Sequence, residues 1–174
     1  MEINPLSSFP VKTFLLAVCL CISALPGRAQ IGEGKAGNRA STLLTAALAQ
    51  GILGVPVEAS TSNTAPDTGA GKTWASRASY TAKSTEGEHP GITLLMGHVS
   101  TAAEAKDIFE SNRDASRGVA VPGIGDAAYR TADPAQLNVL KGATWLIISA
   151  GTPAKPDTAA QEKAAKEILA KLAE

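Results

Sequence analysis

The chain has 174 residues, of which 44% are hydrophobic and 18% are charged. This composition is typical of a soluble globular protein and excludes the disordered and fibrous classes. Its 16 basic and 16 acidic side chains cancel, so the chain lacks the positive charge with which proteins bind nucleic acid. We therefore expect no nucleic-acid partner.

An apolar run near the N-terminus, Phe14–Leu25, is typical of a secretory signal peptide. The run has 12 residues, whereas a membrane-spanning helix needs about 20. Gly27 and Ala29 follow it, small residues placed as signal peptidase requires for a cut before Gln30. The sequence predicts a signal peptide over residues 1–29 and a periplasmic or secreted mature chain without a transmembrane helix. The alternative is an uncleaved N-terminal anchor.

The two cysteines, Cys19 and Cys21, both lie inside this run. Lipid attachment needs a small residue just before the cysteine, and Val18 and Leu20 stand there instead. Both cysteines are therefore expected to leave with the signal peptide. The mature domain is predicted to contain no cysteine, and hence no disulfide and no thiol chemistry.

The mature chain begins with a polar, glycine-rich stretch, residues 30–40, which is predicted to be a flexible lead-in. Residues 41–174 are predicted to be one domain, because a mature chain of about 145 residues makes a single core. A short helix is expected to start at Ser41 and to stop at Gly51. Residues 53–57 follow as a short strand.

A hairpin is the clearest part of the expected sheet. Residues 73–83 alternate between apolar or small side chains and polar ones, as a half-buried strand does. Residues 92–99 are apolar enough for a strand buried on both faces, and a turn at 86–90 joins the two. Residues 59–72, which precede the hairpin, are small and polar and are expected to form a loop.

The second half of the chain repeats the order of helix and then strands. Thr101 and Glu104 make a capping box for a helix that runs to about Asn112. Residues 113–136 are expected to form a long loop with one short strand at 127–130.

Two further strands and a helix complete the predicted fold. Residues 137–140 and 143–150 form a hairpin with a two-residue turn. Thr158 and Gln161 make a capping box for the last helix, which runs to near Leu172. The predicted fold is α+β: an antiparallel sheet of about five to six strands with helices packed on one face, in the order α-β-β-β-α-(β)-β-β-α.

Catalytic, metal and cofactor signatures are weak. Residues 68–73 resemble a phosphate-binding loop, but Pro66 stands where that motif needs its first glycine. His89 and His98 are the only histidines, and neither has further ligands at metal spacing. The G-x-S-x-G elbow of hydrolases is missing from the sequence. We predict no catalytic residue, cofactor or metal site; a hydrolase would have to use His98 or Asp126 in a cleft.

The most distinctive segment is PGIGDAAYR, residues 122–130. Its glycines predict backbone with positive φ, its aspartate an acceptor for backbone N–H groups, and its tyrosine a core side chain. One hypothesis makes it a ligand-facing loop. The other, which we favour, makes it a conformationally demanding corner. The candidate site residues are Gly123, Gly125, Asp126, Tyr129 and Arg130.

Three segments resemble small exported envelope domains of bacteria, a group of unknown function that includes lipoproteins and extracellular sensor domains of membrane kinases. They are STAAEAKDIF (100–109), VPGIGDAAYR (121–130), and LNVLKGATWLIIS (137–149) with the amphipathic helix after it. The resemblance spans about residues 41–172. It implies an antiparallel α+β domain outside the inner membrane, with a ligand cleft and without catalytic residues.

Three functions follow as hypotheses. The first is an exported, non-catalytic envelope protein that binds or senses a small molecule between its helices and its sheet. The second is a structural envelope protein that binds a protein partner through an apolar patch or a sheet edge. The third is an enzyme, most simply a hydrolase. A pocket in the structure would favour the first hypothesis, and a filled core would favour the second.

The signal peptide gives the first testable prediction. We expect the exported protein to begin at Gln30, because the apolar run is cut off after Ala29. N-terminal sequencing of protein purified from the envelope fraction measures this directly. A protein that begins at Met1 and fractionates with cytoplasmic markers would contradict the prediction.

Overall fold

The computed structural model describes residues 38–60, 68–70, 73–83 and 87–173. The predicted signal peptide with Cys19 and Cys21, the cleavage site between Ala29 and Gln30, and most of the lead-in lie outside these residues. Most of the polar segment before the first hairpin lies outside them as well.

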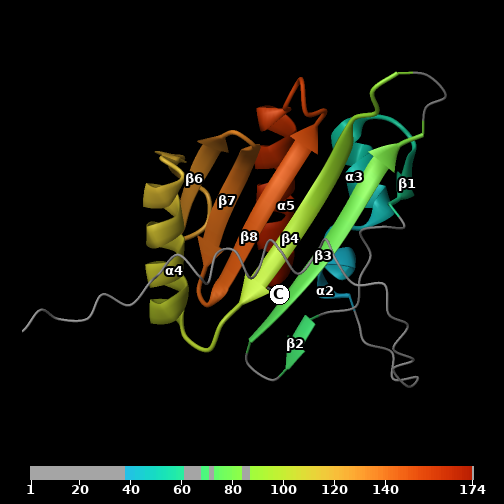
Figure 1. The fold of residues 1–174 in the computed structure, drawn as a ribbon. Helices are drawn as coiled ribbons and strands as arrows, with labels where there is room; N and C mark the ends of the chain where they lie inside the picture. Colours follow the sequence, from blue (N-terminus) through green and yellow to red (C-terminus); the bar gives the residue numbers. More distant parts are fainter. Residues whose placement is uncertain (1–37, 61–67, 71–72, 84–86, 174) are drawn as a thin grey trace, which may run out of the picture. The chain divides into compact units, whose positions relative to one another are not determined.

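The described chain folds into an antiparallel sheet and four helices (Figure 1). The helices are α2 (Arg39–Leu43), α3 (Ala46–Leu53), α4 (Ala102–Ala115) and α5 (Thr158–Leu172). The strands are β1 (Val57–Ala59), β2 (Thr68–Ala70), β3 (Thr73–Ala82), β4 (Gly91–His98), β5 (Val119–Ala120), β6 (Ala127–Ala132), β7 (Ala135–Lys141) and β8 (Thr144–Gly151). They lie in the order β1-β3-β4-β8-β7-β6-β5, and β2 pairs with β3 on the same edge as β1. The α+β class and both predicted hairpins, β3–β4 and β7–β8, are confirmed.

The sheet has eight strands, which corrects the predicted count of five to six. The short strand predicted at 127–130 is confirmed as part of β6. The added strands are β2 and β5, which lie in the segments expected to be loops, 59–72 and 113–136. Strand β2 has three residues and β5 has two, too few to show hydrophobic alternation, so the sequence pattern did not reveal them.

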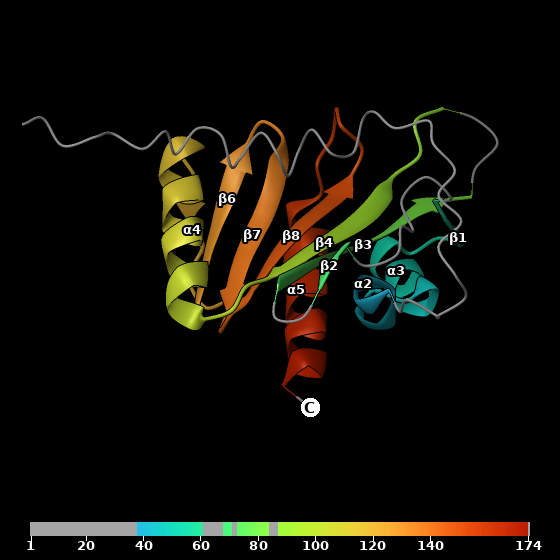
Figure 2. The same ribbon diagram turned by 60° about the horizontal axis from the view of Figure 1, so that its bottom comes forward.

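One face of the sheet, the core face, packs against α2, α3 and α5. The side chains of β4 at Ile92, Leu94 and Met96 alternate onto this face, as do Leu146 and Ile148 of β8. Figure 2 shows these three helices below the sheet. None of the helices described is both long and apolar enough to cross a membrane.

Helix α4 lies on the opposite face, which corrects the prediction that all helices pack on one side. Its Phe109 ring contacts the rings of Tyr129 and Trp145, with centroids 4.8 and 6.5 Å apart. Ala105 and Leu140 complete this second apolar cluster. The strands β7 and β8 therefore carry large apolar side chains on both faces, and the second set needs a helix of its own to exclude water.

The N-terminal helical segment also differs from its prediction. It begins at Arg39, two residues before the expected start, because the Asn38 side chain accepts a hydrogen bond from the Ser41 N–H at 2.9 Å. It then breaks, and α3 begins behind Thr45 and runs past Gly51. The left-handed residue that ends α3 is Gly54, with φ of 72°. The strand expected at 53–57 is accordingly displaced to β1.

The two predicted capping boxes have different outcomes. The Thr101 hydroxyl accepts a hydrogen bond from the Glu104 N–H at 3.1 Å, so this cap is confirmed. The cap of α5 is wrong: Asp157, one residue before Thr158, accepts from the Ala160 N–H at 2.9 Å. Gln161 instead turns into the protein and donates to the Ala135 carbonyl.

This correction gives a testable prediction about α5. Asp157→Ala removes the side chain that caps the helix and is expected to lower the free energy of unfolding by about 1 kcal/mol. Thr158→Ala is the matched control and is expected to change it by less than about 0.5 kcal/mol, since Thr158 is exposed in the first turn. Urea denaturation of both variants measures the difference. A larger loss of stability in Thr158→Ala than in Asp157→Ala would contradict the assignment of Asp157 as the cap.

Candidate functional site

The PGIGD segment forms a tight corner beside the β7–β8 turn. The Ile124 side chain is 4% exposed and belongs to the main core. Gly123 and Gly125 have φ of 78° and 63°, as the sequence predicted. A Cβ on Gly125 would stand 2.5 Å from the Leu140 carbonyl oxygen, so glycine is required there for space as well as for conformation.

Asp126 connects this corner to the β7–β8 turn. One carboxylate oxygen accepts from the Gly142 N–H at 2.7 Å, and the other from the Lys141 ammonium at 2.9 Å. The bond from Gly142 and then the bond from Lys141 hold the pKa of Asp126 below its usual value. This carboxylate therefore stays ionised at neutral pH and fixes the turn, which is a poor basis for acid catalysis.

Tyr129 and Arg130, the other candidate residues, point to opposite faces of the sheet. The Tyr129 side chain is 2% exposed under α4, and burial raises the pKa of its hydroxyl to about 12. The Arg130 guanidinium reaches α5 and donates to the Glu162 carboxylate at 2.8 Å. The five candidate residues therefore do not converge on one ligand, and the corner accounts for Gly123, Gly125 and Asp126.

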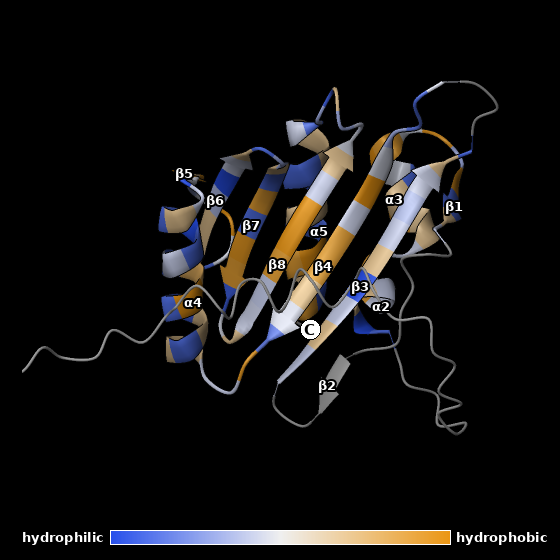
Figure 3. Ribbon diagram, in the orientation of Figure 1, coloured by the Kyte–Doolittle hydropathy of each residue, from blue (hydrophilic) through white to orange (hydrophobic). Residues whose placement is uncertain are grey.

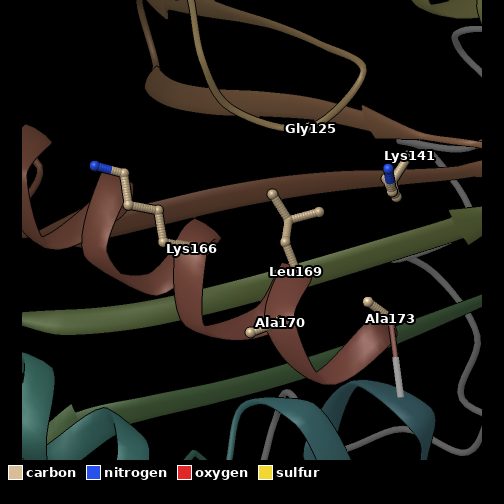
Figure 4. Close-up of a pocket in the computed structure, with 6 residues that line it drawn as sticks. All are labelled: Gly125, Lys141, Lys166, Leu169, Ala170 and Ala173. Atoms are coloured by element: carbon tan, nitrogen blue, oxygen red, sulfur yellow. The ribbon is translucent and has the colours of Figure 1, made fainter.

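A hollow of about 410 Å³ opens between this corner and the C-terminal half of α5 (Figure 4). Of the candidate loop, only Gly125 lines it. Leu169 lies between two lysines, Lys141 and Lys166, and points toward the loop. The residues that line the hollow are Gly125, Lys141, Lys166, Leu169, Ala170 and Ala173.

His98 is held at the end of the core face. Its ring stacks on the Trp74 ring with centroids 5.4 Å apart, and the Arg39 guanidinium lies 4.2 Å from the centroid of the same Trp74 ring. The His98 Nδ1 and the Thr144 hydroxyl are 3.0 Å apart and hydrogen-bonded. Among the residues described, no three of His, Cys, Asp and Glu are placed to hold a metal ion. His89 is exposed in the β3–β4 connection.

One further surface, for which the sequence holds no motif, is the half of the α4 face that α4 leaves uncovered. Helix α4 contacts β7 and β8, while α2, α3 and α5 meet the sheet on its other face. Two rows of cross-strand neighbours lie on β3, β4 and β8 in this uncovered half. We call it the open half-face and define it by Arg77, Leu95 and Ile147 in one row and Ser79, Thr93 and Ser149 in the other. Ser79 is buried, and the other five residues are half-buried.

The open half-face combines aliphatic, hydroxyl and cationic groups. Figure 3 shows that β4 and β8, counting the residues of both faces, are more hydrophobic than β3. The Ser79 and Thr93 hydroxyls are hydrogen-bonded to each other at 2.8 Å. Arg77 is the only Lys, Arg, Asp or Glu in the described strands β3, β4 and β8, and its buried Nε has no hydrogen-bond partner in the described structure. The alternation of β3 predicted a polar face, but not that α4 would cover only β7 and the Trp145 end of β8.

No protein-family model, no curated protein and no solved structure matches this chain. The geometry of the two surfaces, the hollow and the open half-face, is therefore the basis for a functional proposal.

The two glycines of the corner give a testable prediction. Gly123→Ala is expected to lower the free energy of unfolding by about 1 kcal/mol, because φ is positive while no atom lies near the added Cβ. Gly125→Ala adds a collision with the Leu140 backbone and is expected to lower it by about 2–4 kcal/mol. Urea denaturation compares the two. Equal losses would show that the corner is not crowded.

Proposed function

We propose that the protein is an exported, non-catalytic envelope protein that binds a protein partner through its open half-face. Export follows from the sequence of residues 1–29. This is the second of the three functional hypotheses, and the packing of the core favours it over the first.

The observation that carries the proposal is the filled space between α5 and the sheet. Ala164, Ala165 and Ile168 of α5 are 0% exposed, as are Leu146 and Ile148 of β8 beneath them. A small molecule between helix and sheet would need that volume, and protein interiors close-packed in this way hold none. Binding is therefore assigned to the surface.

The composition of the open half-face indicates the chemistry of the partner. Leu95 and Ile147 are neighbours across β4 and β8 and offer apolar area that a partner removes from water. Arg77 and the Ser149 hydroxyl offer hydrogen-bond donors, and no described side chain of these strands is acidic. A partner segment with aliphatic and acidic side chains fits this combination.

The hollow supports a second candidate function, the binding of a small amphipathic anion. Lys166 is exposed, and no described residue is bonded to its ammonium group, so that group is accessible to a carboxylate or phosphate. The side chain of Leu169 next to it would contact an alkyl group. The hydrolase hypothesis is the weakest, because His98 and Asp126 are bonded to Thr144 and to the β7–β8 turn.

Site-specific crosslinking tests the proposed function. A photo-reactive phenylalanine analogue replaces Thr93 or Ser149 on the open half-face, and Glu167 on the exposed side of α5 as the control. On illumination of intact cells we expect discrete protein adducts from positions 93 and 149 and at most a tenth as much from position 167. Mass spectrometry of the adducts identifies the partner.

Equal adduct yields at the three positions would contradict the proposal. Native mass spectrometry of the protein released from the envelope gives an independent result. A co-purified small molecule that is lost in Lys166→Glu would favour the hollow over the open half-face.

A further inference from the structure

We propose that the partner of the open half-face is a second copy of this chain, whose α4 lies on it. The inference rests on the proposed function and names its partner. In the pair, α4 of each protomer covers the open half-face of the other, so the contact is made twice around a two-fold axis.

The dimensions of the open half-face fit one helix. The axes of the two outer strands, β3 and β8, lie about 10 Å apart, which is the diameter of a helix with its side chains. Strand β4 has 8 residues and is about 26 Å long, and α4 has 14 residues and is about 21 Å long. A second helix beside α4 therefore completes the layer that α4 begins.

The outer side of α4 carries acidic side chains, which the open half-face lacks. Asp107 lies two residues from each of the buried Ala105 and Phe109, which places it about 200° away from both, on the crest of the helix. Lys106 pairs with Glu110, and Arg113 pairs with Asp114. Asp107 has no ion pair among the residues described, and the carboxylate of one protomer's Asp107 is matched by Arg77 of the other.

Pairing through the sheet edges is the less favourable route to a dimer. The strands at the edges are short: β1 and β2 have 3 residues each, and β5 has 2. A short edge strand offers few free N–H and C=O groups to another chain. The open half-face spans the longest strands of the sheet, so it offers the larger contact area.

Sedimentation equilibrium of the purified exported protein tests the inference. We expect a monomer–dimer equilibrium at protein concentrations up to about 1 mM. Arg77→Glu and Asp107→Lys are each expected to raise the dissociation constant at least about tenfold, because each brings like charges together at both contacts. Glu167→Lys, an equal charge reversal on the exposed side of α5, is the control and is expected to leave it unchanged.

An equal mixture of the two variants is the decisive sample. In a heterodimer, Arg77→Glu faces Asp107→Lys at one contact and the unchanged pair meets at the other, so we expect the mixture to dimerise where each variant alone does not. Asp107 is exposed, so Asp107→Lys is expected to fold. If the mixture dimerises, Arg77→Glu must have folded as well.

A wild-type protein that stays monomeric at about 1 mM would overturn the inference. So would a dimer that neither variant weakens. In either case adducts to another protein from positions 93 and 149 would leave the proposed function standing, whereas the loss of all site-specific adducts would remove it.

Discussion

The close contact between α5 and the sheet is the constraint on which the rest of the structure depends. Alanines at 160, 164 and 165 bring the helix axis near the strands, and Ile168 fills the remaining space. Because alanine has no side-chain atom beyond Cβ, the helix packs directly against the strands, and the space between them is close-packed. The core face is therefore covered by helices, with the hollow beside the C-terminal half of α5, and α4 covers part of the other face.

Hydrophobic alternation made the two hairpins and the last helix predictable from the sequence, because each is long enough to show its period. The alternation on Thr73–Ala82 even separated a dry face from a wet one. The short strands β2 and β5 were beyond that method, and the strand β1 was predicted too early in the chain, at 53–57. The side on which α4 packs was also beyond that method, because it depends on where Phe109 meets Tyr129 and Trp145, residues distant in the chain.

The candidate surfaces likewise include one that the sequence predicted and one that it did not. The glycines and the aspartate of PGIGD predicted a demanding corner, and the positive φ angles and the bonds of Asp126 to the β7–β8 turn agree with it. A motif can thus stand out in a sequence because a hairpin needs it. The open half-face has no such motif: its six residues come from three strands and are brought together by register alone.

The pairing of β4 with β8 has a consequence for how the chain reaches this fold. These central strands, Gly91–His98 and Thr144–Gly151, are joined across the 45 intervening residues 99–143. The sheet therefore cannot close in the middle until β8 has been synthesised, and the cost of closing so long a loop slows the step. Until then β4 has one neighbour and its most apolar side has no cover. A nascent chain with this topology therefore keeps an unpaired edge in the middle of its future sheet until Gly151 has been made.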